Sequence, residues 1–367
     1  MTTTSSRRRL HAAAILAAAS ALLLAAGAPL AQQPLKIGFV YVSPIGDAGW
    51  TFQHDEGRKQ MEKALGAKVQ TRFVESVAEG ADSERVIREF AASGSQLVFA
   101  TSFGYMNPTL KVAKQFPKVM FEHATGYRQD KNVGTYNARF YEGRYLNGLI
   151  AGKMTKSNVA GYVAAFPIPE VLQGINAFTL GMKRTNPNAE LKVIWTSSWF
   201  DPGREREAAS TLIAQGADVI THHTDSTAVV QVAEEKGKYA FGYHSDMSKY
   251  GPKAHLTATT HQWGDYYTRT VAAALAGKWQ PGDVWGGMKD GMIKLAPLNP
   301  AIPADVVALV EKVGAEIKAG SFHPFTGPFK DNEGKERLAA GRAMPDAELA
   351  KMNYYVAGVQ GKLPAAK

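Results

Sequence analysis

Residues 35–57 read LKIGFVYVSPIGDAGWTFQHDEG, and this stretch decides the fold. Its first part, 35–42, is apolar and rich in β-branched and aromatic residues, which predicts a buried strand. Serine, proline and two glycines break the strand at 43–49, and an amphipathic helix is predicted from Thr51 onward. Ligands of open parallel α/β sheets bind beyond the carboxyl ends of strands, so Trp50 stands where a site would lie. A tryptophan can equally belong to the core, and this stretch alone leaves both interpretations open.

The amino terminus predicts a cleaved secretory signal peptide at 1–31. Three arginines at 7–9 precede an uncharged run rich in alanine and leucine at 12–26, and small residues follow it. An uncleaved membrane anchor is the alternative, but the apolar run is short for a spanning helix of about 20 residues. The arginine cluster also fits a twin-arginine signal loosely. We therefore expect a periplasmic protein with no stable membrane insertion after cleavage.

Composition excludes several kinds of site and partner. The 367 residues contain no cysteine, which excludes disulfides, thiolate metal ligands, cysteine nucleophiles and a lipidated amino-terminal cysteine. Without the signal arginines the chain holds 39 basic and 33 acidic residues, and these are interspersed, unlike those of a nucleic-acid-binding surface. The adjacent His222 and His223 would point to opposite faces of a strand, so no metal pair is predicted. We expect no cofactor, no metal, no nucleic-acid partner and a monomer.

Apolar runs and helical patterns alternate along the chain, which predicts parallel sheets with right-handed crossovers. Further strands are expected at 69–74, 96–100, 119–121, 159–164, 191–195, 219–221, 239–243 and 255–260. Helices are expected at 83–92, 107–115, 142–154, 168–183, 203–214, 227–235, 264–276 and 303–318. A strand pair is expected within 285–296 and a helical stretch at 345–359. Two successive runs of similar size predict an α/β protein of two lobes.

Unusual residues gather at the carboxyl ends of these expected strands. Each end carries an aromatic residue, a carboxylate or both, among them Phe103, Glu122, Phe166, Trp199, Asp225 and Asp246. Asp225 could equally cap the helix that follows it. Aromatic walls and acidic acceptors suit a flat heterocycle that bears N–H donors.

Five motifs taken together resemble those of the BMP/PnrA-like family of periplasmic solute-binding proteins of ABC transporters. They are GDAGWTFQHDEG at 46–57, GSQLVFA at 94–100, THHTDS at 221–226, GYHSD at 242–246 and KDG at 289–291. The resemblance implies a type I periplasmic-binding fold, with two doubly wound parallel-sheet lobes joined by a multi-segment hinge. It also implies that the lobes close over a purine nucleoside or related small molecule and deliver it to an ABC transporter permease.

The predicted lobes are built from separate pieces of the chain. Lobe 1 comprises 34–138 and about 262–288, lobe 2 comprises 139–261 and about 289–325, and an extension follows at 326–367. The hinge is expected near 137–140, 260–263 and 285–290, and ligand should close it by rotation of the lobes.

The resemblance assigns site roles to particular residues. It implies that Trp50 stacks on the base, that Glu122 accepts from the purine edge and that Trp199 closes the sandwich from the second lobe. Two departures bear on the ribose: Trp50-Thr51 replaces Phe-Asn, and 259–263, which contains His261, replaces a segment with a lysine. A free base such as adenine is therefore an equal candidate. The predicted ligand-binding residues are Trp50, Phe103, Glu122, Phe166, Trp199, Asp225, Asp246 and His261.

The sequence contains none of the nucleotide-binding, metalloprotease or nucleophile-elbow motifs that we sought, so an enzyme is not predicted. Glu122 and Asp246 could serve as paired carboxylates in a nucleoside hydrolase, which is the less favoured alternative. A ligand-sensing receptor for a membrane signalling partner would use the same cleft and stays open as a third interpretation.

Overall fold

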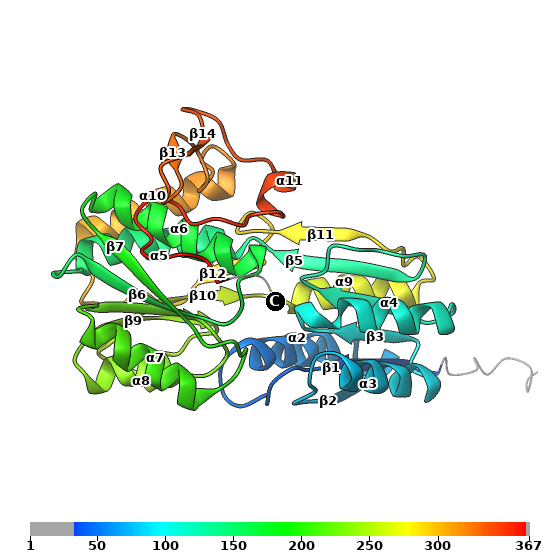
Figure 1. Ribbon diagram of the computed structural model, residues 1–367. Coiled ribbons are helices and arrows are strands. Elements are labelled where there is room, and N and C mark those ends of the chain that lie inside the picture. Colours follow the sequence, from blue (N-terminus) through cyan, green and yellow to red (C-terminus); the bar gives the residue numbers. More distant parts are fainter. Residues whose placement is uncertain (1–32, 365–367) are drawn as a thin grey trace, which may run out of the picture. The chain divides into compact units, whose positions relative to one another are not determined.

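Two six-stranded sheets organise the computed structural model, which describes residues 33–364 (Figure 1). The predicted signal peptide at 1–31 lies outside the described residues. In sheet order, the strands of the first sheet are β11 (Asp283–Gly286), β5 (Val133–Ala138), β4 (Met120–Ala124), β3 (Leu97–Ala100), β1 (Leu35–Val40) and β2 (Val69–Val74). Those of the second are β12 (Ile293–Leu295), β10 (His255–His261), β9 (Tyr239–His244), β8 (Val219–His223), β6 (Val159–Ala164) and β7 (Glu190–Trp195). All pairings are parallel except that of β12, which lies antiparallel to β10.

Helices cover both faces of the first sheet because its central strands β1 and β3 are apolar on both sides. Phe39 and Phe99 pack with Met61 on the face covered by α2 (Trp50–Leu65) and α9 (Gly264–Leu275). Val40 and Val98 point the other way and pack against α3 (Ala81–Ala92) and α4 (Met106–Gln115). Alternation along a strand that is buried on both faces explains the continuous apolar run at its start.

The second sheet repeats this layered arrangement. The helices α7 (Pro202–Ala214) and α8 (Ala228–Glu235) pack against one face through Leu212 and Val229. The other face is covered by α5 (Phe140–Met154) and α6 (Pro169–Thr185), and α10 (Ala304–Ala319) packs on α5. Short 3₁₀ turns in the described part of the chain are η2 (Gly66–Lys68), η3 (Phe103–Tyr105) and η4 (Ser248–Tyr250). The predicted α/β class with two parallel-sheet halves is confirmed.

The chain passes between the sheets three times, after β5, after β10 and after β11. These crossings fall at 139, 262–263 and 287–292, close to the segments predicted as the hinge. Residues 35–364 belong to one compact unit, with contacts between its two halves. The lobe boundaries and the hinge motion stay predictions.

Two expectations for the carboxyl region were wrong. The strands within 285–296 do not pair with each other, because β11 extends the first sheet and β12 extends the second. The helical stretch expected at 345–359 is limited to α11 (Asp346–Leu349). The residues after α11 run extended across the second half instead, where a carbonyl and an amide of this segment bond to the buried side chain of Asn176.

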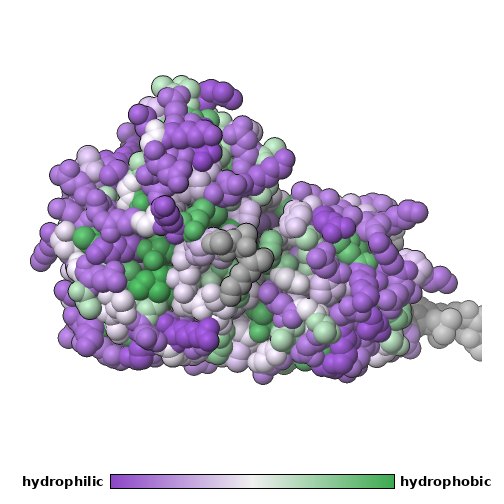
Figure 2. All heavy atoms as spheres, in the orientation of Figure 1, coloured by the Kyte–Doolittle hydropathy of each residue, from purple (hydrophilic) through white to green (hydrophobic). Residues whose placement is uncertain are grey.

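The carboxyl-terminal segment also contains a small hairpin of β13 (Phe329–Lys330) and β14 (Glu336–Leu338). In the same segment, Asp346 of α11 accepts two hydrogen bonds from the guanidinium of Arg139, at 2.6 and 2.7 Å, at the point where the chain first crosses between the sheets. Within residues 33–364, no helix is both long and apolar enough to cross a membrane. The face shown in Figure 2 is mainly hydrophilic, with hydrophobic residues exposed in small separated groups.

Candidate functional site

A cavity that is partly open to solvent lies between the carboxyl ends of the two sheets. Its empty volume, open solvent included, is about 300 Å³. The first half contributes one side, here called the first wall, which consists of Val42, Trp50, Ser102, Phe103 and Thr125. The second half contributes the second wall, which consists of Glu170, Trp199, His223, Asp225 and His244. Every one of these residues ends a strand or lies in the loop or first helical turn after it, which is where parallel α/β sheets bind ligands.

Trp50 is part of both the first wall and the core. It is the first residue of α2 and is 6% exposed. Its indole nitrogen Nε1 donates to the carbonyl of Thr101 at 2.6 Å, and its ring packs edge-on against His54 and Trp263. The core interpretation is therefore confirmed, and Trp50 also lines the cavity, so its role as a ligand-binding residue stays a prediction.

Glu79 links the two walls by accepting hydrogen bonds from both of them. Its Oε1 accepts from the hydroxyl of Ser102 at 2.6 Å and from the backbone nitrogen of Gly104 at 2.8 Å, both in the first half. The same oxygen accepts from Nε1 of Trp199 in the second half at 3.1 Å. This shared acceptor holds the Trp199 indole across from the first wall, and Phe166 supports that indole edge-on at 5.0 Å.

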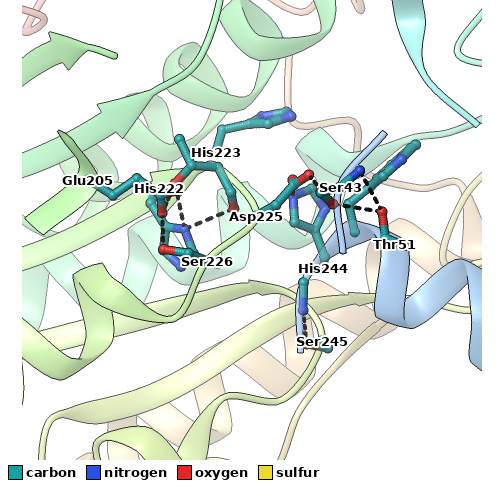
Figure 3. A network of polar contacts seen from close by, with 12 residues as sticks. Ser43, Thr51, Glu205, His222, His223, Asp225, Ser226, His244 and Ser245 are labelled. Carbon is teal, nitrogen blue, oxygen red and sulfur yellow. Dashed lines mark hydrogen bonds and ion pairs between the residues drawn. The ribbon is translucent and has the colours of Figure 1, made fainter. Parts of the chain in front are cut away.

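The loop that precedes α2 makes a second set of contacts between the halves (Figure 3). Ser43 donates from its hydroxyl to Oδ2 of Asp225 at 3.2 Å, and the backbone nitrogen of Gly49 donates to Oγ of Ser245 at 2.9 Å. A Cβ atom placed on Gly49 would lie 2.1 Å from the carbonyl oxygen of Asp225. Only glycine permits this approach, and its φ of +102° also lies in the region that favours glycine.

Glu170 and His223 face each other in the second wall. Glu170 stands in the first turn of α6, and its Oε1 lies 3.4 Å from Nε2 of His223. Burial raises the pKa of Glu170 to about 8 and holds the pKa of His223 well below its usual value. Both groups therefore favour their neutral forms near pH 7.

Asp225 and His244 complete the second wall. Nε2 of His244 lies 3.3 Å from Oδ1 of Asp225, and burial lowers the pKa of this histidine well below its usual value. Burial, together with the nearby Glu205, raises the pKa of Asp225. The loop around Asp225 is fixed from behind by Glu205, whose Oε2 accepts from Thr224 and Ser226 at 2.8 and 2.6 Å (Figure 3).

Unusual backbone conformation marks both walls. Thr125 in the first wall and His244 in the second have φ angles of +62° and +67°, in the left-handed region that residues other than glycine rarely occupy. Such residues cost of order 1–3 kcal/mol each and cluster at functional sites. Their position on opposite sides of one cavity is an independent indication that this cavity is the functional site.

The structure brings four of the eight predicted site residues into the cavity lining: Trp50, Phe103, Trp199 and Asp225. Phe166 supports Trp199 without being among the lining residues. His261 is fully buried behind the cavity, with its ring against Phe140 at 4.3 Å. These six residues lie in one region.

Glu122 and Asp246 lie elsewhere. The carboxylate of Glu122 accepts from the hydroxyl of Tyr266 and from Nε1 of Trp279, both at 2.7 Å, and Glu122 is not among the cavity-lining residues. Asp246 has a 43% exposed side chain and accepts from the backbone nitrogen of Ser248 at 2.9 Å, as a turn residue does. A role for either in binding stays a prediction that this geometry does not favour.

Glu170 and His244 were not expected as site residues, and for the pair His222 and His223 only one cleft-facing member was expected, without saying which. His223 and His244 close β8 and β9, where the rule of strand ends places ligands. The alternation of adjacent strand residues directs His223 to the cavity and His222 to Thr224. Glu170 stands six residues beyond the end of β6. It could have been found if the first turn of the next helix had been included with each strand end. Among residues 33–364, no group of three or more His, Asp or Glu side chains is placed to hold a metal ion.

Comparison with known proteins gives concordant matches. Residues 35–321 match the family described as ABC transporter substrate-binding protein PnrA-like. The chain is 54% identical over 338 residues to a purine-binding protein of Brucella abortus (strain 2308), with 92% of this chain and 96% of that protein covered. It is 37% identical over 339 residues to a protein of Haloferax volcanii assigned as an ABC transporter glucose-binding protein, with 92% and 84% covered. A solved solute-binding protein of an ABC transporter from Aeropyrum pernix K1 shares the fold, with a TM-score of 0.69 at 19% identity over 81% of this chain and 93% of that one.

Proposed function

Because the chain belongs to the PnrA-like family of ABC transporter substrate-binding proteins, we propose that it captures a purine base or purine nucleoside in the cavity between its sheets and delivers it to an ABC importer. The family consists of transport components, and we infer that this member binds its ligand without turnover. The periplasm is the compartment that the proposal requires.

The composition of the cavity is the observation that supports a purine as the ligand. Trp50, Phe103 and Trp199 supply aromatic surface from both walls. Stacking on aromatic rings suits a flat heterocycle and adds roughly 0.5–1.5 kcal/mol per pair beyond the burial of apolar area. The polar groups of the second wall then meet the edge of the ring, where a purine carries its nitrogen donors and acceptors. The 54% identical relative that is named for purine binding supports the same class of ligand.

A monosaccharide such as glucose is the second candidate, because the Haloferax relative is assigned to glucose. Sugars also stack on tryptophan, but they present hydroxyl groups around the whole ring and need polar partners on several sides. Among the described residues that line the cavity, the first wall offers only the hydroxyls of Ser102 and Thr125, and both already donate to acceptors within the protein. Their oxygens can still accept, but neither hydroxyl has a free donor, which favours a purine.

Isothermal titration calorimetry and thermal melting with a fixed panel test the proposal. The panel contains adenine, hypoxanthine, guanine, xanthine, adenosine, inosine, uracil and D-glucose, and the protein is unfolded and refolded first to remove any carried-over ligand. A purine at about 100 times its Kd should stabilise the protein by about 2.7 kcal/mol. Incubation with adenosine and inosine should release no free base. Stabilisation by glucose with no response to any purine would overturn the proposal.

A further inference from the structure

Glu170 carries an unusual combination of burial and missing partners. Its side chain is 11% exposed and borders the cavity. The oxygen Oε2 has no hydrogen-bond partner among the described residues, and Oε1 faces His223 at 3.4 Å. A buried carboxyl oxygen without a partner costs free energy, so such a group needs an explanation in a native structure.

The surroundings of Glu170 do not compensate a negative charge. His223 on β8 is neutral, and the other titratable groups that face Glu170 are the phenols of Tyr162 on β6 and Tyr243 on β9. Asn137 on β5 of the first sheet places its side-chain amide near Glu170, where hydrogen bonding lowers the pKa of Glu170 by less than burial raises it.

Arg144, a cation on this side of the second sheet, contacts other groups instead of Glu170. The guanidinium carbon of Arg144 lies 3.3 Å from the centre of the Tyr243 ring, and its nitrogens donate to the Thr221 hydroxyl and the His222 carbonyl at 2.9 and 2.5 Å. No lysine or arginine within residues 33–364 forms an ion pair with Glu170. A buried carboxyl without a cation favours its protonated form.

A protonated carboxyl group recognises a different pattern from a carboxylate. It places one O–H donor beside one C=O acceptor, whereas the carboxylate can only accept. The edge of a purine repeatedly places a ring N–H or amino group beside a ring nitrogen or carbonyl oxygen. Such an edge matches the protonated group with two hydrogen bonds and matches the carboxylate with one.

We propose that Glu170 is the residue that reads the edge of the bound base, and that it does so as a neutral carboxyl group that donates one hydrogen bond and accepts another. This proposal rests on the proposed function, because it assumes a purine in the same cavity. It explains why a buried acid is retained in the wall without a cation. Because either oxygen can hold the proton, the group accepts a donor–acceptor edge in both orientations, so it does not restrict the site to adenine or to an oxopurine.

The proposal predicts a direction for the effect of pH. Burial raises the pKa of Glu170 to about 8 against a smaller opposing effect of the Asn137 side chain, so the neutral form prevails below that pH. Affinity should therefore be constant from about pH 6 to pH 7 and should fall as pH rises through 8, by up to about tenfold per pH unit. The histidines of the wall do not produce this change because burial holds their pKa values well below 6.5. Asp225 also has a raised pKa, so a variant must isolate the contribution of Glu170.

The test compares the wild type, Glu170→Gln and Glu170→Ala by calorimetry with adenine and with hypoxanthine at about pH 7 and pH 9. Glutamine keeps one donor beside one acceptor but cannot ionise. We expect Glu170→Gln to bind within about threefold of the wild type at pH 7 and to show little of the loss seen for the wild type at pH 9. We expect Glu170→Ala to bind at least about tenfold more weakly at pH 7. The fraction of free ligand that is ionised at a given pH is the same for all three proteins, and adenine and hypoxanthine, which ionise differently, serve as controls for it.

The outcomes separate this proposal from the proposed function. If the wild type binds no purine, the proposed function fails, and the proposal for Glu170 fails with it. If the wild type binds a purine but Glu170→Gln is as weak as Glu170→Ala, the carboxylate is required and the neutral reading is overturned. Unchanged binding by Glu170→Ala would remove Glu170 from the site. Melting curves without ligand identify a variant that fails to fold, and Glu170→Gln then carries the test because it keeps the size of the side chain.

Discussion

The two walls of the cavity differ in how their polar atoms are used. In the first wall, the indole nitrogen of Trp50 and the hydroxyls of Ser102 and Thr125 all donate to acceptors within the protein. In the second wall, Glu170, His223 and His244 each have a buried polar atom with no hydrogen-bond partner among the described residues. The first wall is therefore satisfied within the fold, whereas the second wall retains polar atoms that, under the proposed function, a ligand would contact.

This difference suggests a division of labour under the proposed function. The first wall offers a rigid aromatic surface on which a ring can stack, because its side chains are already fixed by packing and hydrogen bonds. The second wall offers free donors and acceptors that fix the identity and orientation of the ring. Substitutions in the first wall should change stability and affinity together, whereas substitutions in the second should change mainly affinity and selectivity.

The largest effect is expected from Trp50→Ala, compared with Trp199→Ala. Trp50 packs in the core, so its truncation should lower the free energy of unfolding by about 3–5 kcal/mol. Trp199 is only partly buried, so its truncation should lower the free energy of unfolding much less. Both should weaken purine binding by about 2 kcal/mol or more, as expected for a central aromatic anchor. Denaturant unfolding measures the first quantity and calorimetry the second.

Equal losses of stability in the two tryptophan variants would contradict the contrast between the walls. Unchanged affinity in both would contradict the stacking role and direct attention to Phe103 and Phe166. Phenylalanine replacements serve as controls, because they retain an aromatic face while removing the indole N–H that bonds to Thr101 in one case and Glu79 in the other.

An intermediate effect is expected where the walls approach each other most closely. Gly49→Ala places a Cβ atom 2.1 Å from the carbonyl oxygen of Asp225, so the loop that contains Gly49 must move away from the second wall. Overpacking of this kind costs about 1–3 kcal/mol, which should appear as a weaker affinity and a faster ligand release. Stopped-flow tryptophan fluorescence during ligand displacement measures the release rate.

Gly80→Ala is the matched control for this prediction. Gly80 precedes α3 as Gly49 precedes α2, and its φ of +98° is close to the +102° of Gly49, but a Cβ atom there would meet nothing within 4 Å. The two variants therefore share the backbone strain and differ only in the contact with the second wall. Ligand release that is equally fast in both would show that strain, and not contact between the walls, controls closure.

The smallest effect on binding is expected from Glu122→Gln. Both Glu122 and Glu170 are buried acids with a raised pKa, to about 7 and about 8, but the oxygens of Glu122 are bonded to Tyr266 and Trp279 within the first half. We expect Glu122→Gln to leave the order of affinities across the purine panel unchanged within about threefold. A changed order in Glu122→Gln together with an unchanged one in Glu170→Gln would restore the role that the family resemblance implied for Glu122.

Much of the architecture was predictable because it depends on local pattern. The strands expected at 69–74 and 159–164 match β2 and β6 residue for residue, and the expected α/β class, the type I periplasmic-binding fold and the family resemblance are confirmed. Continuous apolar runs identify strands buried on both faces; the motif at 46–57 follows such a strand, and the motif at 221–226 begins within β8. The strands near 285–296 were assigned to the wrong partners because a three- or four-residue strand carries no sequence information about which sheet edge is vacant.

The sequence alone was enough to predict the family and most strands and helices, although β5 was not among the expected strands. Hydrophobic periodicity and motif spacing are properties of neighbouring residues, so they can be recognised without the fold. Only the tertiary structure decided which acid faces the cavity. Glu122 lies within β4 and Glu170 lies in the first turn of α6, yet Glu122 is bonded to Tyr266 and Trp279 and Glu170 lines the cavity without a cation. The hydrogen-bond partners of Glu122 are 144 and 157 residues away in the sequence. The Asn137 amide that affects Glu170 comes from a strand of the other half. Burial and hydrogen bonding of this kind depend on contacts between distant segments, which local pattern does not encode.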